Sequence, residues 1–254
     1  MKGEAVRYLR ASLTAAAVLV ALAAAGGGTY AFLTGGSAEA AAPDPTPSTV
    51  TPTKDHDCGK VGEFQEEVEK SLESLAEYGS VFVDGEQSQE DCDAIEAFQK
   101  RFGIKPAKGR ADELTRDVAK RIAEQSFDEC PTAEHGTTVC VDLTNQTLWV
   151  VEDGERIFGP TVVRTGMAGH ASTTGTHTIN HRADREWSEP YEQWLPYWQH
   201  YYAGEGLHET TSYLHDPSLG SHGCTNLLRQ DAKKLYEMLD YGDTVEVFGK
   251  RSGT

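Results

Sequence analysis

A cysteine beside a histidine is the most chemically suggestive feature of the sequence. Cys224 follows His222 and Gly223 in the segment GSHGCTN, residues 220–226. A thiol attacks as its thiolate, and a nearby cation, imidazolium or helix N-terminus lowers its pKa below about 8.5. We therefore expect Cys224 to be a nucleophile with a lowered pKa, in a loop ahead of a helix. The backbone N–H groups of Gly223 and Cys224 would receive an oxyanion. The alternative is an inert, buried cysteine.

A second histidine, His208, could fold back to act as the general base. It stands in the segment GLHE, residues 206–209, and we expect Glu209 to tune its pKa electrostatically. A zinc site is an alternative, because His208, His215 and His222 recur every seven residues with Cys224 close behind. No H-E-x-x-H helix supports this alternative, so we expect neither a metal nor a cofactor.

The five cysteines indicate a protein outside the cytoplasm with one free thiol. An odd number leaves one unpaired, and Cys224 has the reactive surroundings. We expect bridges between Cys58 and Cys92 and between Cys130 and Cys140, because each pair closes a short loop within one structural unit. The alternative pairing, Cys58 with Cys130 and Cys92 with Cys140, would lock two domains together.

Residues 1–42 have the pattern of an export segment. Three basic residues precede an uncharged run over residues 11–38, and Ala-Glu-Ala at 38–40 is a candidate cleavage site. The run is also long enough to span a bilayer, so a cleaved signal peptide and a retained anchor are both open. Either one places the rest of the chain in the cell wall or on the outer face of the cytoplasmic membrane.

The composition restricts the partners of the folded part. Residues 43–57 are rich in proline and threonine and predict a semi-extended spacer. The formal net charge of −17 argues against nucleic acid as a partner. A negative net charge also gives no electrostatic attraction to anionic lipids or wall phosphates. Attachment to a cell wall would therefore require specific binding sites. We expect a monomer.

Residues 58–130 have a helical period. Three apolar stripes predict three short helices, and they consist of Phe64, Val68, Leu72 and Leu75; Cys92, Ile95, Phe98 and Phe102; and Leu114, Val118 and Ile122. Ser88 and Asp91 form a capping box ahead of the middle helix. The segment 83–104 resembles the peptidoglycan-binding three-helix module of bacterial wall enzymes, although we expect its phenylalanines to be core residues.

Residues 131–250 have a period close to two and predict a mainly β domain. Strands over 138–142 and 147–152 flank a turn at 144–146 and predict a hairpin. Further strands are expected over 161–165, 176–180 and 244–248. One helix is clear, over 230–239.

Three segments of this β region together resemble the catalytic domain of the L,D-transpeptidases (YkuD-like). They are TTGTHTI at 173–179, GLH at 206–208 and SHGCTN at 221–226, followed by a short helix and a closing strand. The resemblance implies a β-sandwich-like barrel in which Cys224 is the nucleophile and His208 the base. His222 and Gly223 complete the catalytic signature, and Ser221 and Asn226 are expected to contact substrate. Asn226 replaces an arginine of many members.

An aromatic cluster over 186–202 suggests the rim or lid of a substrate groove, with β-sandwich packing as the alternative. Its Leu195-Pro196-Tyr197 looks like a Met-Pro-Tyr segment that lies beside the site in the family. We expect Tyr197 to donate to the oxyanion and Trp198 to contact substrate.

The resemblance implies an acyltransferase of peptidoglycan biosynthesis that uses stem peptides as donor and acceptor. The cysteine would attack between the diamino acid at position three and the terminal D-alanine, and a neighbouring amine would then take the acyl group in a 3-3 cross-link. The alternatives are an L,D-carboxypeptidase and a catalytically silent wall-binding protein.

Overall fold

The computed structural model describes residues 58–130, 135–210 and 212–254. The expected export segment, residues 1–42, and the spacer, residues 43–57, lie outside the described residues. Within the described ranges, no helix is both long enough and apolar enough to cross a bilayer.

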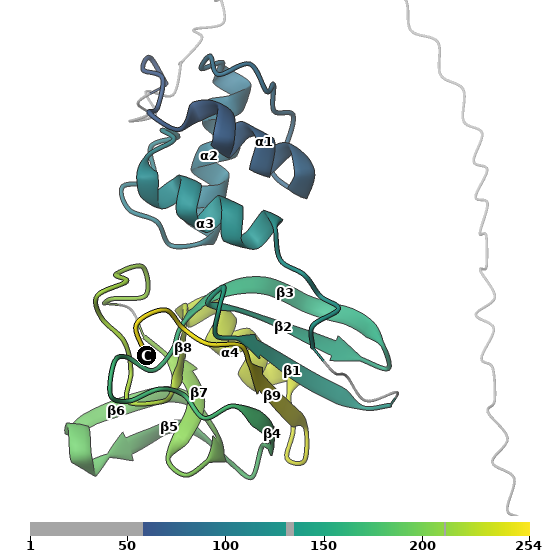
Figure 1. The fold of residues 1–254 in the computed structure, drawn as a ribbon, viewed down its shortest axis with the longest axis vertical. Coiled ribbons are helices and arrows are strands. Elements are labelled where there is room, and N and C mark those ends of the chain that lie inside the picture. Colours follow the sequence, from purple (N-terminus) through teal and green to yellow (C-terminus); the bar gives the residue numbers. More distant parts are fainter. Residues whose placement is uncertain (1–57, 131–134, 211) are drawn as a thin grey trace, which may run out of the picture. The chain divides into compact units, whose positions relative to one another are not determined.

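The first described region is a bundle of three helices, α1 (Gln65–Leu75), α2 (Gln89–Arg101) and α3 (Glu113–Ala123) (Figure 1). The predicted apolar stripes face one another in a shared core, and Phe98 and Phe102 are buried in it. The predicted capping box is confirmed, because Ser88 and Asp91 bond reciprocally at the start of α2. Local periodicity and capping therefore account for this bundle.

The second region is a single sheet of nine strands with one α-helix, which confirms the mainly β fold. Its strand order is β4-β9-β1-β2-β3-β8-β7-β6-β5 (Figure 1). The elements are β1 (Thr137–Asp142), β2 (Thr147–Glu152), β3 (Glu155–Arg164), β4 (Gly175–Thr178), β5 (His181–Ser188), the 3₁₀ turn Glu189–Tyr191, β6 (Gln193–Tyr202), β7 (Glu205–Glu209), β8 (Thr225–Leu227), α4 (Arg229–Met238) and β9 (Thr244–Phe248).

The predicted β1–β2 hairpin, the helix and the closing strand are all present. The third strand is longer than predicted, since β3 begins at Glu155 and continues through Gly159 and Pro160. Proline and glycine in a sequence suggest the end of a strand, but here the pairing of β2 with β3 accommodates them through register shifts.

The main core lies under the sheet and is covered by α4. Val139, Val150, Val163, Leu207 and Leu235 are among its fully buried members. On β3 the side chains alternate, so that Val162 joins the core of the helical bundle instead. The bundle also bonds to α4, through Arg101 Nη1 to Asp231 Oδ2 at 3.0 Å.

The aromatic segment over 186–202 forms the β5–β6 hairpin. Its members divide between the two expected roles: Trp198 and Tyr201 are buried, whereas Trp187, Tyr191 and Trp194 are exposed. Position along the hairpin explains the division, since Trp187 pairs with Trp194 beside the turn that holds Tyr191, whereas Trp198 and Tyr201 lie farther along β6, where it pairs with β7.

Both expected disulfides are present. Cys58 bonds to Cys92, Cys130 bonds to Cys140, and Cys224 is free. The second bridge packs beside the buried Trp149.

We expect the two bridges to differ in their effect on stability, because they close loops of different length. Their sequence separations are 34 residues for Cys58–Cys92 and 10 for Cys130–Cys140. The chain-entropy model assigns about 4 kcal/mol to the first and about 3 kcal/mol to the second. Denaturant unfolding of the two double alanine variants measures this difference. An equal or larger loss for the Cys130–Cys140 pair would contradict it.

Candidate active site

The parallel pairing of β7 with β8 brings the two expected catalytic residues together. In this register Leu207 lies opposite Thr225 and His208 opposite Asn226. Cys224 immediately precedes β8, and its Sγ lies 3.7 Å from the carbonyl oxygen of Gly204, just ahead of β7. The nucleophile loop therefore leads into a strand rather than directly into a helix, which corrects the sequence-based expectation.

His208 is held as a neutral base. Its ring is 5% exposed, and Nδ1 lies 2.8 Å from the carbonyl oxygen of Glu209. A carbonyl only accepts, so Nδ1 carries the proton and donates it, which leaves Nε2 as a free acceptor. Burial lowers the pKa of His208 to about 4, and the bond to Glu209 opposes this only in part. The imidazole is therefore uncharged at neutral pH.

The expected electrostatic tuning by the Glu209 carboxylate is wrong. Side chains alternate along β7, and the Glu209 carboxylate lies 3.4 Å from Arg229 Nη1 at the start of α4. Glu209 acts on His208 through its backbone carbonyl instead.

The expected lowering of the Cys224 pKa is also wrong. Burial raises the pKa of the thiol to about 11; the Gly206 N–H opposes this rise, and the Glu205 carboxylate adds to it. The three groups expected to lower it are not at the sulfur. The next helix, α4, begins only at Arg229. The exposed His222 ring packs against His170 and Tyr191, with ring centroids 4.1 Å and 4.6 Å away. A neutral thiol thus lies near a neutral imidazole.

Hydrogen bonds within the nucleophile loop correct the expected oxyanion donors. The Gly223 N–H donates to Ser221 Oγ at 3.1 Å, so it is already engaged, and Ser221 Oγ–H donates to the Cys224 carbonyl at 2.6 Å. Ser221 therefore braces the loop. The N–H groups that face the sulfur are those of Cys224 itself and of Gly206. Sequence reasoning missed Gly206, whose position follows only from strand pairing.

Two side chains that sequence reasoning missed also hold the loop. Ser172 Oγ–H donates to the Gly223 carbonyl at 2.6 Å. The Glu205 carboxylate accepts from the Thr173 N–H and, at 2.7 Å, from the Thr173 hydroxyl. It fills the space where a Cβ on Gly223 would lie, at 2.9 Å. Thr173 belongs to the 173–179 motif of the sequence. That motif therefore indicated one of the residues that hold the nucleophile loop, but not its partner Glu205.

The remaining predicted residues lie in different surroundings. Tyr197 packs against the main core, 6.0 Å from the Tyr236 ring, and is not placed as the expected oxyanion donor. Trp198 is buried 5.9 Å from the His208 ring and supports the base. Asn226 is fully buried; its Nδ2 donates to the Tyr213 hydroxyl at 2.6 Å, and its Oδ1 has no partner among the described residues.

A cavity of about 230 Å³ lies beside the base. Residues 193–196 of β6 form one wall, and His208, Glu209, Thr210, Ser212 and Tyr213 form the other. The aromatic hairpin thus borders a groove at His208, which is consistent with a role as its rim.

The histidines of the zinc alternative are each engaged elsewhere. His215 Nε2 lies 2.7 Å from the Phe102 carbonyl oxygen, and His222 stacks on His170. In the described part of the chain, no three His, Cys, Asp or Glu side chains form a group that could hold a metal ion.

We expect Gly223→Ala to be more destabilising than Gly169→Ala, although both glycines have positive φ, at 117° and 78°. A Cβ at Gly169 meets no atom within 4 Å, whereas at Gly223 it meets Glu205 at 2.9 Å. Backbone strain alone predicts a loss of about 1 to 2 kcal/mol for Gly169→Ala, and steric overlap adds about 1 to 3 kcal/mol for Gly223→Ala. Denaturant unfolding compares the two, and equal losses would show that Glu205 does not constrain the loop.

Known proteins similar to this chain share both the fold and the site region. Residues 136–247 match the family model of the L,D-transpeptidase catalytic domain, YkuD. A crystal structure of an L,D-transpeptidase from Stackebrandtia nassauensis is 64% identical, covers 80% of this chain and 100% of its own, and has a TM-score of 0.76. An Enterococcus faecium L,D-transpeptidase mutant is 27% identical over 45% of this chain and 50% of its own, with a TM-score of 0.40. No curated protein gives a significant match.

The family model covers the β region that holds Cys224 and His208, and the Stackebrandtia nassauensis protein is similar over most of the chain. The chain therefore belongs to the L,D-transpeptidase (YkuD) catalytic-domain family.

Proposed function

We propose that this protein forms 3-3 cross-links in peptidoglycan through an acyl-enzyme on Cys224. The observation that carries the proposal is the free Cys224 thiol beside the β7–β8 pair, on which a neutral His208 keeps Nε2 available as an acceptor. A general base of this kind allows a thiol with a raised pKa to attack as its proton leaves.

In the proposed first step, Cys224 Sγ attacks the carbonyl of the third residue of a donor stem, and the thiol proton passes to His208 Nε2. The oxyanion accepts hydrogen bonds from the N–H groups of Cys224 and Gly206. The C–N bond then breaks, and D-alanine leaves with the proton that the imidazolium returns. A thioester remains on Cys224.

In the second step, the side-chain amine of an acceptor stem attacks the thioester, and a proton of that amine passes to His208. The C–S bond breaks, the new amide forms, and Cys224 regains its proton. Amines attack thioesters readily, and the burial of His208 with the partial burial of Cys224 restricts water at the site. Both features favour transfer over hydrolysis.

The remaining assignments follow from the same proposal. Two disulfides fit an extracytoplasmic protein exported by residues 1–42. We assign residues 58–130 to a wall-binding helical module and residues 131–250 to the catalytic domain. The protein would act as a monomer on peptidoglycan stem peptides.

We expect Cys224→Ala to abolish activity while leaving the fold intact, because the nucleophile has no substitute. His208→Ala should lower the rate about 10²- to 10⁴-fold, since general-base assistance is lost. The protein is incubated with a carbapenem or a disaccharide-tetrapeptide, and peptide mass mapping locates the added mass.

The matched control is His181→Ala, because His181 is an exposed histidine of β5 that pairs with Glu186. It should retain the wild-type rate. Full rate in His208→Ala at neutral pH would contradict the base assignment. Absence of mass on Cys224 would refute the acyl-enzyme, and release of D-alanine without cross-linked product would indicate a carboxypeptidase.

A further inference from the structure

A cavity of about 630 Å³ lies between α3 and the loops of the catalytic domain, and its lining carries excess positive charge. Its charged lining residues are Arg116, Arg121, Arg164 and Arg251 with Glu113 and Asp117. This excess stands out in a chain whose formal net charge is −17. The volume is in the range of small-ligand sites.

Three of the four arginines have partners in the protein. Arg116 pairs with Glu113 at 3.5 Å, and Arg121 pairs with Asp117 at 3.1 Å. Arg251 donates through both terminal nitrogens to four carbonyl groups, those of Thr165, Gly166, Pro217 and Leu219. These hydrogen bonds connect the C-terminal segment to the neighbouring loops. The terminal nitrogens of Arg251 are therefore already engaged within the protein.

Arg164 differs from these three. Its side chain is 5% exposed, and Nε donates to the Leu214 carbonyl at 2.9 Å. Its two terminal nitrogens have no hydrogen-bond or ion-pair partner among the described residues. Burial, followed by the nearby charges of Arg121 and Arg251, lowers the pKa of Arg164 to about 10, and the Asp117 and Asp216 carboxylates oppose this only in part, so it is still a cation at neutral pH. Neither carboxylate is bonded to the guanidinium among the described residues. A buried cation without a bonded anion is costly, and an oxyanion at its terminal nitrogens would offset that cost.

Strand pairing connects Arg164 with the catalytic base. Arg164 on β3 lies opposite Asn226 on β8, and Asn226 lies opposite His208 on β7. Directly paired residues share a face of the sheet, so the three form one row with inter-strand steps of about 4.8 Å. The row places the backbone of Arg164 roughly 10 Å from that of His208.

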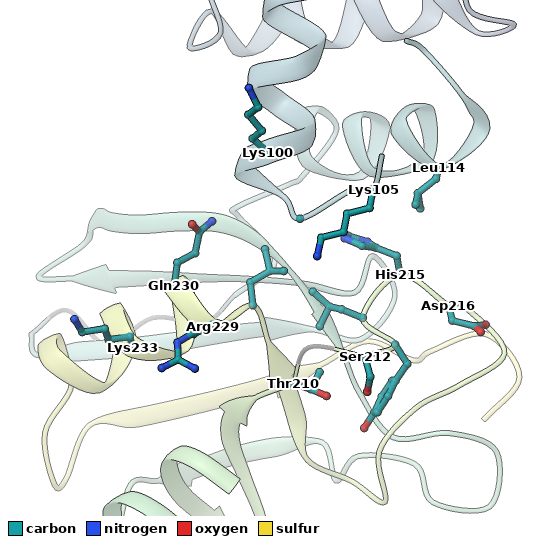
Figure 2. A pocket seen from close by; sticks show the side chains of 14 residues that line it. Lys100, Lys105, Leu114, Thr210, Ser212, His215, Asp216, Arg229, Gln230 and Lys233 are labelled. Carbon is teal, nitrogen blue, oxygen red and sulfur yellow. The ribbon is translucent and has the colours of Figure 1, made fainter. Parts of the chain in front are cut away.

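A further cavity adjoins both the groove at His208 and the cavity at Arg164. It encloses about 700 Å³ and shares Thr210, Ser212 and Tyr213 with the groove at His208. It shares Leu114 and His215 with the Arg164 cavity. Figure 2 shows its lining side chains, Lys105 and His215 among them. Its lining has four basic residues, Lys100, Lys105, Arg229 and Lys233, and one acidic residue, Asp216.

We propose that Arg164 binds the C-terminal carboxylate of the acceptor stem peptide, which reaches it from the active site through the cavity of Figure 2. This inference rests on the proposed function. A guanidinium with free terminal nitrogens binds a carboxylate in a bidentate manner.

The geometry selects the acceptor over the donor. The donor's terminal carboxylate belongs to the residue after the scissile bond, so it lies only about one residue, roughly 3.8 Å, beyond the reacting carbonyl. That span is much shorter than the roughly 10 Å between the backbones of His208 and Arg164, so the longer reach of the acceptor is the better match. The acceptor reacts at the end of a side chain, so its C-terminal carboxylate lies several bonds farther from the reacting amine.

The first test measures binding without turnover. A stem tetrapeptide is titrated calorimetrically into the Cys224→Ala protein, as the free acid and as the C-terminal amide. We expect the amide to bind roughly 10- to 100-fold more weakly, since a hydrogen bond to a charged group is lost. Arg164→Gln should remove this difference, and Arg164→Lys should restore part of it. Arg116→Gln removes the same charge from the rim of the cavity and should leave the difference intact.

The second test separates the subsite from the chemistry. In protein with Cys224 present, Arg164→Gln should raise the KM for acceptor about tenfold or more and leave the acylation rate of Cys224 by a carbapenem unchanged. Equal binding of acid and amide by protein with Arg164 would overturn the subsite, even if Arg164→Gln fails to fold. Arg164-dependent binding of inorganic phosphate that does not compete with the tetrapeptide would also overturn it. Absence of acylation would instead refute the proposed function, whatever the binding result.

Discussion

The parallel pairing of β7 with the three-residue strand β8 is the constraint on which the site depends. It sets the register in which His208 lies opposite Asn226 and Gly206 lies beside Cys224. A shift of one residue would turn the His208 ring to the opposite face of the sheet. The bonds from Ser172 to Gly223 and from Thr173 to Glu205 hold the nucleophile loop in that register. Residues far apart in sequence therefore hold the backbone around the Cys224 sulfur in place.

The same pairing buries His208 and partly buries Cys224, and this desolvation decides their charge. A carbonyl at Nδ1 fixes the tautomer of His208 but supplies no negative charge, so burial dominates and the imidazole stays neutral. The thiol of Cys224 lies near the Glu205 carboxylate and is neutral as well. Attack therefore requires proton transfer in the same step. An excess of positive charge instead lines the cavity at Arg164, whose strand position shares the face of His208.

Local sequence signals predicted the parts of the fold that depend on local interactions. The apolar stripes and the Ser88 cap predicted the helices, the turn at 144–146 predicted the first hairpin, and short loop closure predicted both disulfides. The sequence also singled out Cys224 and His208, and the structure brings both to the β7–β8 pair. The sequence did not predict β5 to β8 as strands, the engagement of the Gly223 N–H, the role of Glu205 or the raised thiol pKa. These features depend on which distant segments are buried together.

The most direct test of this account is the titration of the His208 imidazole, followed by NMR on protein with ¹⁵N-labelled histidine. Burial disfavours the cation, so the folded pKa is below the usual value, and the ring is neutral at every pH above it. We expect a pKa of about 4 and a proton on Nδ1 throughout the neutral range. A pKa at or above about 6.5, with a cationic His208 beside a Cys224 thiolate at neutral pH, would contradict the account.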